Sequence, residues 1–373
     1  MSEEVLALLA LSSVEGLGCR TIHRLLDHFK DPCLIFASTR DNLVRQGVPE
    51  PLAASLLSGK PRDAAGQTWS RCQQDGIQIV PFRDSRYPGL LKEIYDPPVV
   101  LYIKGEIATL QRPVIALVGS RHPTPYGLNA AERLARDLAG RGLVIASGMA
   151  RGIDSASHRG ALSARGTTVA VLGSGLDLIY PRENQKLARQ IEQSGCLISE
   201  FPPGTPPVPQ NFPVRNRIIS GISLGTCVVE AAEFSGSLIT ARLALEQGRE
   251  VFAVPGNITS KNSFGPNLWI KQGAKLVQDW KDIVEELPRP VKEGICQQEL
   301  EAAGQRQGNL FGDAFTTLEK RVLELLTNDE ALHVDQLLES SGLSSSELLA
   351  TLSELEMKDK VRQLRGKYFV RKF

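Results

Sequence analysis

Two spacings of apolar residues alternate along the chain, and they predict where helices and strands lie. Residues 1–70 place apolar positions three or four apart, as in EVLALLALSS and RTIHRLLDHF, which predicts short amphipathic helices. From Gly76 the apolar runs become short, β-branched and bounded by Pro and Gly, beginning with GIQIVPF and PPVVLYIKG. We therefore expect a small helical domain over residues 1–70, followed at once by a sheet.

The turn between the first two helical runs reads Val14-Glu15-Gly16-Leu17-Gly18. A Gly-apolar-Gly turn is typical of the helix-hairpin-helix, in which glycines let backbone N–H groups approach a phosphate at a helix N-terminus. A tight connection between two packed helices needs the same glycines. The N-terminal domain is thus expected to be SAM-like or helix-hairpin-helix-like, and both roles for its turn stay open.

Strand-like runs then alternate with helical stretches, starting with VIALVGS, YGLNAAERLARDLAG and GLVIASG. Helices of this length between strands predict βαβ units, because parallel neighbours need a crossover connection. Over residues 71–287 we expect an α/β fold, a Rossmann-like and doubly wound sheet that is mostly parallel. Residues 288–312 carry Pro, Gly and Gln with little apolar periodicity, which predicts a linker.

Residues 313–373 predict a winged-helix domain. Three helical stretches precede VRQLRGKYFVRKF, which is typical of a hairpin that turns at Arg365-Gly366. A serine cap with Glu347 predicts a capping box at the third helix, which is the expected recognition helix, Ser345 to Met357. That helix has three glutamates and no Arg or Lys, whereas residues 358–373 hold seven basic residues and one acid. The pattern favours protein contact over sequence-specific DNA reading by the helix.

Composition places the chain among ordinary globular proteins and narrows its chemistry. Its 373 residues include 43 Lys+Arg, 42 Asp+Glu and 42% hydrophobic residues, which excludes wholesale disorder and predicts two or three domains. The six cysteines form no CxxC pair and no zinc pattern, which fits a reducing compartment. We find no apolar run long enough to span a bilayer and no basic signal-peptide region, and therefore expect a cytoplasmic protein without a metal.

Glycine-rich turns are expected where strands of the core end. In an open parallel sheet these carboxyl ends line one crevice, into which helix N-termini point their N–H groups. The turns are Gly119-Ser120-Arg121, Gly148 to Gly152, Gly173-Ser174-Gly175 and Gly221 to Gly225. Any single βα loop can need its glycine for geometry alone. The turns converge, however, with Arg121, Arg151, Arg215 and Arg217, and residues 111–217 hold 13 basic against 7 acidic residues, so we expect a phosphate-binding crevice.

The usual nucleotide-binding and catalytic motifs are missing from the sequence. GSGLDL has Leu178 where the third glycine of GxGxxG belongs, and there is no P-loop, GxSxG elbow or HExxH helix. His158 follows Asp154 by four residues, which suits an N-terminal cap better than a proton shuttle. Tyr180 with the nearby Lys186 could stack a base and hold the next phosphate, or Tyr180 could be a core residue. We expect no catalytic residue and no cofactor.

The core is similar throughout to the DNA-processing protein A (DprA or Smf) family, the recombination mediators of natural transformation. The matching stretches include ALVGSRHPTPYG, SGMARGIDSASHRGAL, VLGSGLDLIYPREN, SEFPPGTPPVPQNFPVRNRIISGIS, VVEAAEFSGSLITARLALEQGREVFAVPG and GPNLWIKQGAKLV. The resemblance implies a protein without catalytic activity that binds and protects single-stranded DNA. It further implies loading of a RecA-type recombinase and a homodimer.

Carried over motif by motif, the resemblance implies a set of DNA-backbone contacts. They are Gly119, Ser120, Arg121, Gly148, Arg151, Gly152, Gly173, Gly175, Lys186, Arg215, Asn216 and Arg217. The family's dimer surface would lie near Leu268, Ile270 and Leu276. The helical N-terminal region and the winged helix resemble domains appended to the core in many members.

Two other functions compete with this one. The segment SLGTCVVEAAEFSGS resembles the GTxxE turn of Rossmann-like phosphoribohydrolases that cleave nucleoside monophosphates, with Glu230 at the catalytic position. Leu224 breaks the full GGxGTxxE pattern of that group, so we disfavour the enzyme. A winged-helix transcription factor that uses the core as a ligand sensor is disfavoured by the acidic recognition helix.

Overall fold

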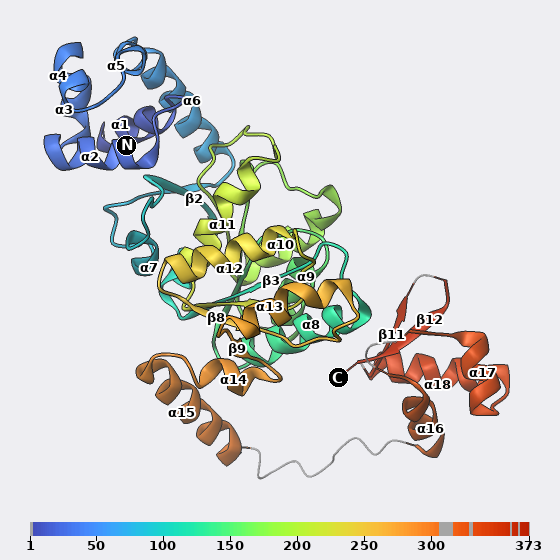
Figure 1. Cartoon of the computed structure of the whole chain (residues 1–373). Coiled ribbons are helices and arrows are strands. Elements are labelled where there is room, and N and C mark those ends of the chain that lie inside the picture. Colours follow the sequence, from blue (N-terminus) through green and yellow to red (C-terminus); the bar gives the residue numbers. More distant parts are fainter. Residues whose placement is uncertain (1–2, 306–315, 328–330, 359, 365, 373) are drawn as a thin grey trace.

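Three parts follow one another along the chain in the computed structural model, which describes residues 3–305, 316–327, 331–358, 360–364 and 366–372. An N-terminal helical bundle, a central α/β core and a C-terminal winged-helix domain lie in this order (Figure 1). This organisation confirms the expected fold class: a Rossmann-like, mostly parallel sheet with a helical segment before it and a winged helix after it.

Short helices form the N-terminal bundle where apolar residues recur at helical spacing. They are α1 (Glu3–Ser12), α2 (Cys19–Phe29), α3 (Pro32–Phe36), α4 (Arg40–Arg45), α5 (Glu50–Leu56) and α6 (Lys60–Gln74). Gly16 turns the chain between α1 and α2 with a φ of +85°, and Leu17 of the same turn is buried in the bundle. The expected domain boundary at residue 70 falls inside α6, which ends at Gln74.

Mostly parallel strands form the central sheet. They are β1 (Gln78–Pro81), β2 (Val100–Gly105), β3 (Val114–Val118), β4 (Val144–Ser147), β5 (Thr168–Val171), β6 (Cys196–Ser199), β7 (Gly225–Val228), β8 (Glu250–Ala253) and β9 (Lys275–Leu276). Within the described residues their order is β1-β2-β6-β5-β4-β3-β7-β8-β9. Neighbours from β6 to β9 pair in parallel, and β2 is antiparallel to both of its neighbours.

Helices cover both faces of the sheet, so its strands are buried on both sides and read as continuous apolar runs. One face is covered by α8 (Pro125–Ala139), α9 (Ile153–Ser163), α10 (Gln185–Ser194) and α14 (Trp280–Val284). The other is covered by α7 (Gly89–Lys92), α11 (Asn211–Gly221), α12 (Gly236–Glu246) and α13 (Phe264–Lys271). Short 3-10 turns lie at η1 (Ile107–Gln111), η2 (Arg182–Asn184) and η3 (Lys261–Ser263).

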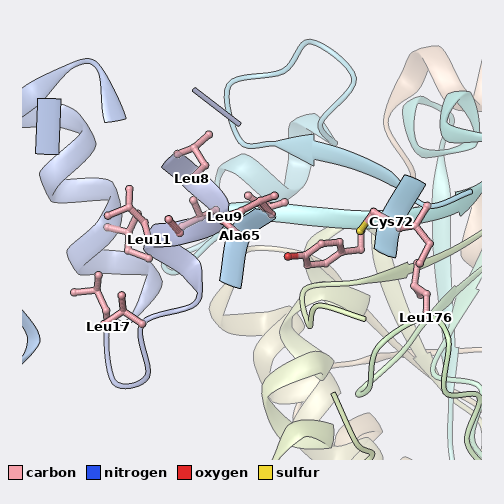
Figure 2. Close-up of a cluster of buried hydrophobic side chains, with 14 of the residues drawn as sticks. Leu8, Leu9, Leu11, Leu17, Ala65, Cys72 and Leu176 are labelled. Atoms are coloured by element: carbon pink, nitrogen blue, oxygen red, sulfur yellow. The ribbon is translucent and has the colours of Figure 1, made fainter. Parts of the chain in front are cut away.

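A continuous apolar cluster joins the N-terminal bundle to the core (Figure 2). Leu9 and Leu11 of α1 belong to it, as do Cys72 of α6, Tyr102 of β2 and Leu176 of the loop after β5. Burial of apolar surface stabilises such a contact by about 25 cal/mol for each Å² removed from water. The bundle is therefore packed on the core at the edge formed by β1 and β2.

The direction of winding changes at β3. Its neighbours are β4 on one side, reached through α8, and β7 on the other. Loops that leave the carboxyl ends of β3 and β7 diverge toward opposite faces, and such a switch point opens a crevice at the edge of the sheet. The fold thus creates the crevice that the glycine-rich turns predict.

The C-terminal domain has the expected winged-helix elements. They are α16 (Thr317–Leu325), β10 (Leu332–His333), α17 (Val334–Ser341), α18 (Ser345–Met357), β11 (Val361–Leu364) and β12 (Tyr368–Arg371). Ser344 and Glu347 form the predicted capping box at the start of α18. Gly366, with a φ of +85°, lies in the turn between β11 and β12, and Arg365 lies outside the described residues. Glu354 and Glu356 of α18 are exposed.

The expected linker is corrected by the structure, because helix α15 (Arg289–Gln305) occupies most of residues 288–312. Val291 and Ile295 of this helix pack on the apolar cluster beneath α8. These two residues are spaced i, i+4 and therefore share one helix face, a signal that the surrounding Pro and Gln concealed. Residues 306–312 lie outside the described residues.

The described part of the chain shows no membrane-spanning helix, no disulfide bond and no cluster of metal ligands. None of its helices combines the length and the apolar character that a bilayer span needs. Its six cysteines are free thiols. Its His, Cys, Asp and Glu side chains form no group of three or more that could hold a metal ion.

His158 of α9 makes stability depend on pH in a predictable direction. Its ring is fully buried, and Nδ1 lies 2.7 Å from the Thr168 hydroxyl, which itself donates to the Ile145 carbonyl. Burial lowers the pKa of His158 from 6.5 to about 3. A depressed histidine pKa stabilises the fold above pH 6.5, and this contribution is lost as the pH falls and the unfolded chain takes up the proton.

We expect His158→Asn, which keeps a donor toward Thr168, to lack this acid sensitivity. The difference in free energy of unfolding between the wild type and the variant should shrink by up to about 1.4 kcal/mol per pH unit below pH 6.5. Urea unfolding at several pH values between 7 and 4 measures the difference. Parallel pH profiles of the two proteins would contradict the assignment.

Candidate functional site

A cleft of roughly 890 Å³ opens at the carboxyl ends of β3 and β7. Its walls come from the loop after β3, the loop after β7, the start of α11 and the first turn of α12. It lies at the switch point of the sheet, the place where doubly wound folds bind ligands. The predicted crevice is therefore a real cavity of this chain.

The structure brings part of the predicted set into this cleft. Six of the predicted residues line it, and they are Gly119, Ser120, Arg121, Tyr180, Arg215 and Asn216. Gly148 and Arg151 line a smaller pocket beside it, which shares Arg121 and Tyr180. The remaining residues of the set line neither cavity, and they are Gly152, Gly173, Gly175, Lys186 and Arg217.

Arg121, Phe212 and Tyr180 form one wall of the cleft. The Arg121 guanidinium lies over the Phe212 ring, 5.4 Å from its centroid, and the Tyr180 ring lies 5.8 Å from the Phe212 ring on centroids. Tyr180 is 47% exposed, so it is a wall residue rather than a core residue. Arg121 is exposed and has no carboxylate partner among the described residues. The wall presents an unneutralised cation beside accessible aromatic faces.

Arg215 forms the floor of the cleft. Its Nη1 donates to the backbone carbonyls of Gly148, at 2.6 Å, and of Val171, and these carbonyls lie at the ends of β4 and β5. Burial lowers the pKa of Arg215 to about 10, although Asp154 opposes this shift, so the guanidinium stays protonated at neutral pH. Its Nε–H has no hydrogen-bond partner in the described chain. Arg215 thus joins two strand ends and leaves positive charge beneath the cleft.

Two glycines let the backbone close around this floor. A Cβ at position 148 would lie 2.6 Å from the Arg215 guanidinium, so only glycine lets the turn after β4 approach it. Gly152 has a φ of +75°, and a Cβ there would lie 2.3 Å from the Ser120 carbonyl oxygen. These glycines serve the geometry of the turn, and Gly152 does not itself reach the cavity.

Arg151 and Lys186 lie on the rim. Arg151 forms an exposed bidentate ion pair with Glu183, with both N–O distances at 2.8 Å. Exposed pairs of this kind contribute only about 0–1 kcal/mol, so a competing anion can displace the carboxylate. Lys186 is exposed on the first turn of α10. Gly173 packs beneath the Phe212 ring, and Gly175 packs beneath the loop at Pro202.

Arg217 does not face the cleft, which corrects the prediction for this residue. It is 6% exposed, and its guanidinium pairs with Glu200 at 2.6 Å and with Asp96 at 3.0 Å. Burial by itself lowers the pKa of Arg217, but the Glu200 carboxylate raises it by more, so the pair is ionised. The charge of Arg217 is already satisfied inside the protein.

The turn from Gly221 to Gly225 also lies elsewhere. Helix α11 ends at Gly221 and β7 begins at Gly225, so this turn is at the amino end of a strand and not at the carboxyl edge. The helix begins at Asn211, five residues before the run NRIISGIS that starts at Asn216. The loop that does reach the cleft from β7 runs over residues 232–236.

Sequence reasoning missed several cleft residues. Phe212, Phe234, Lys261 and Phe264 all line the cavity, and Phe234 is 95% exposed. A signal for Phe234 exists in the sequence, because a lone aromatic in a Gly- and Ser-containing turn after a buried strand is poorly explained by packing. Lys261 and Phe264 come from the segment before α13 and give no such signal.

The candidate catalytic side chains are held by neighbouring groups, and of the three only Asp154 lines the cleft. His158 is fully buried away from the cleft, and Asp154 accepts a hydrogen bond from the Ala150 N–H while facing Arg215. Glu230 is buried, and its carboxylate accepts hydrogen bonds from the backbone N–H and the hydroxyl of Thr124 at the start of α8. Glu230 lines neither cavity.

The three residues predicted at a dimer surface lie at one end of the sheet. Leu268 and Ile270 are on α13, and Leu276 is on β9, the edge strand after β8. Leu268 is 38% exposed and Leu276 is 39% exposed. The edge of a sheet with exposed apolar side chains is a surface that pairing with another chain would cover.

Fold and site together define a Rossmann-like α/β protein that has a switch-point crevice and an appended winged helix. The family model of DNA recombination-mediator protein A matches residues 78–288, and the model of the DprA winged helix domain matches residues 313–367. The chain belongs to the DprA/Smf family of DNA processing proteins, the recombination mediators.

Curated relatives and solved structures agree with this assignment. The chain is 41% identical to Protein Smf of Escherichia coli (strain K12) over 83% of this chain and 81% of that protein, and 48% identical to DNA processing protein DprA of Bacillus subtilis (strain 168) over 58% and 73%. The structure of DNA processing protein A from Streptococcus pneumoniae is similar with a TM-score of 0.61 and 33% identity over 77% of this chain and 99% of that chain.

A second solved structure, of DNA processing protein A from Helicobacter pylori, was described for the single-stranded DNA binding mode of that protein. It is similar to this chain with a TM-score of 0.51 and 29% identity, over 60% of this chain and 96% of that chain. The sequence identities to these two structures, 33% and 29%, are above the range in which similarity shows a shared fold alone.

The burial of Arg217 predicts a role in stability. Arg217→Met leaves the Glu200 carboxylate buried without its partner, and breaking a buried pair in this way costs about 3–5 kcal/mol. Urea unfolding should show this loss, and the double variant Arg217→Met with Glu200→Gln should recover part of it. A single variant as stable as the wild type would show that the pair is dispensable.

Proposed function

We propose that this chain binds the backbone of single-stranded DNA in the cleft at β3 and β7, protects the strand, and loads a RecA-type recombinase onto it during natural transformation. The observation that carries the proposal is the exposed and unneutralised guanidinium of Arg121 on the aromatic wall formed by Phe212 and Tyr180. A cation beside stacking surfaces is how proteins hold single strands without reading their sequence.

The electrostatics of the cleft support a polyanionic ligand. Arg121 pairs with no carboxylate in the described part of the chain, and Arg215 is protonated beneath the floor. The exposed Arg151–Glu183 pair on the rim is weak enough for an anion to displace the carboxylate. Glu233 also lines the cleft, at the side formed by the loop after β7. The positive side is the one that follows β3 and β4, and phosphates are expected there.

The contacts differ in kind among the proposed residues. Arg121, Arg151 and Lys186 would contact phosphates through side chains, and Ser120 and Asn216 through hydrogen bonds in the cleft. Tyr180 would stack on a base. The glycines of the set would let the backbone approach the strand, and Arg215 would act from beneath by its charge.

Recombinase loading and protection rest on family membership. The chain belongs to the recombination mediators, and the Helicobacter pylori relative was described as a single-strand binder. Loading requires that the bound strand be handed on, so binding through phosphates and stacking alone suits a mediator. We propose no chemical step and no cofactor for this chain.

The phosphoribohydrolase alternative is weakened by the placement of Glu230. That carboxylate is held by Thr124 and Asn262 and is turned away from the cleft. Burial raises the pKa of Glu230, although its hydrogen bonds oppose this shift. If the protein released free base from a nucleoside monophosphate in an activity assay, the phosphoribohydrolase function would be supported.

We further propose that two copies pair through the end of the sheet at α13 and β9. Leu268, Ile270 and Leu276 would be covered by the same patch of the partner, as a two-fold interface requires. A dimer would bring two clefts into one assembly and raise the avidity for a long strand.

Charge reversal at Arg121 is expected to abolish binding of single-stranded DNA, because it places an acid where the strand's phosphates approach. Fluorescence anisotropy with a labelled oligonucleotide should show a loss of more than about tenfold for Arg121→Glu, and wild-type binding should weaken with salt by a log–log slope of roughly −0.7 per phosphate contact. Arg289→Glu, an equally large charge change on exposed α15, is the matched control. Equal binding by Arg121→Glu and Arg289→Glu would overturn the site.

Leu276→Glu, alone or with Leu268→Glu, is expected to give a monomer, because it introduces a desolvated charge at the proposed interface. Sedimentation equilibrium or light scattering measures the mass in solution. Leu34→Glu is the control, since Leu34 is 52% exposed on α3 of the N-terminal bundle. A dimer that survives in the double variant would place the interface elsewhere.

A further inference from the structure

The tip of the winged-helix domain docks on the outer side of the core. The Asn129 side-chain amide of α8 donates to the Arg371 carbonyl of β12 at 3.0 Å. Arg362 of β11 forms an ion pair with Glu132 of α8, and Lys372 lies 3.9 Å from the same carboxylate. Strands β11 and β12 accordingly lie on the side of the winged-helix domain that faces the core in Figure 1.

This contact encloses a groove of about 530 Å³ between the core and the wing. Five cationic side chains line it, and we call it the interdomain basic groove: Arg133, Arg136, Arg159, Arg362 and Lys372. The first three come from helices α8 and α9 of the core, and the last two come from the wing. Neither domain alone supplies the whole set.

Among the described residues, the groove has more cations than carboxylates. Glu132 is shared by Arg362, Lys372 and Arg159, the last at 3.6 Å, and Asp137 is shared by Arg133 and Arg136 at 3.8 and 3.6 Å. These two carboxylates lie beside five cations in the part of the groove that the structure describes. Cations held this close repel one another, and an anion in the groove would relieve that repulsion.

The lining points to phosphate rather than to an acidic peptide or a base. Guanidinium groups bind phosphate oxygens through paired N–H donors, and four of the five cations are arginines. The described residues that line the groove include no aromatic or large apolar side chain, so they offer neither a stacking platform nor an apolar contact. A chain of phosphates needs only cations and space.

The groove lies along the two helices, α8 and α9, that follow two loops of the cleft. Helices α8 and α9 both begin at the cleft edge, after the loops that carry Arg121 and Arg151. Arg159 lies six residues beyond Ile153 and Arg133 eight beyond Pro125, which at 1.5 Å per residue is about 9 and 12 Å along the helices. A strand that left the cleft over Arg151 and followed α9 would reach the groove.

We propose that the interdomain basic groove binds the phosphodiester backbone of the same DNA strand that the cleft holds, so that the strand runs from the core to the wing. The inference rests on the proposed function and adds a second segment to its binding site. Because the wing contributes Arg362 and Lys372, a bound strand would also hold the winged helix against the core, and docking would in turn strengthen binding.

The test uses the full chain and two labelled single-stranded oligonucleotides. One has about 6 nucleotides, near the lower end of the ~4 to 16 that one binding fold covers, and the other has about 30. Arg133→Gln with Arg136→Gln should leave binding of the short strand unchanged, weaken binding of the long strand about tenfold and reduce its log–log salt slope by up to about 1.4. Arg45→Gln with Arg289→Gln removes the same charge elsewhere and is the control.

The variant Lys372→Gln removes a cation on the wing side and leaves the core helices unchanged. It too should weaken binding of the long strand and leave binding of the short strand unchanged. The proposal is overturned if the Arg133/Arg136 variant and its control bind the long strand with equal affinity and salt slope. It is also overturned if only duplex binding falls. Arg121→Glu should weaken both lengths. If Arg121→Glu weakens neither, the cleft function fails, and any effect of the groove variants then belongs to an independent site.

Discussion

Parallel pairing of strands β3 to β9 is the constraint on which the rest of the structure depends. Because these strands run in the same direction, their carboxyl ends all lie at the same edge of the sheet. Each connection between parallel neighbours must cross back over the sheet. Loops far apart in the sequence, such as 119–121 and 232–236, meet there around one cleft. The reversal of winding at β3 turns that edge into a cavity. Arg215 then ties the edge together by hydrogen bonds to the ends of β4 and β5.

The segment Arg215-Asn216-Arg217 shows how helix geometry divides roles among adjacent residues. Positions i and i+2 on a helix point in nearly opposite directions. Arg215 therefore lies beneath the cleft, whereas Arg217 pairs with Glu200 and Asp96 on the other side of α11. Asn216, between them, faces the cleft and donates to the Gly236 carbonyl. Adjacent residues of one motif can thus lie in different surroundings, at the cleft or in a buried ion pair.

Several of the basic residues that are concentrated between positions 111 and 217 lie in two places in the fold. Some of the basic residues between 111 and 217 reach the cleft and its rim, with Arg121 and Arg151 among them. Others, on α8 and α9, line the interdomain basic groove instead. The basic wing supplies the opposite side of that groove, while the acidic face of α18 points away to solvent. Core and wing thus both contribute cations to this groove, although the net charge of the chain is only +1.

The elements, their order and the family could be predicted from the amino-acid sequence, because apolar periodicity, caps and turn glycines act over a few residues. It predicted the crevice and placed Arg121 and Tyr180 there. It could not show that residues 289–305 form a helix, that Gly221 to Gly225 lies at the wrong edge, or that Arg217 is neutralised. It also gave no sign that the wing docks on α8. Those outcomes were decided only by the tertiary structure, since burial, charge pairing and domain contact depend on residues brought together from distant parts of the chain.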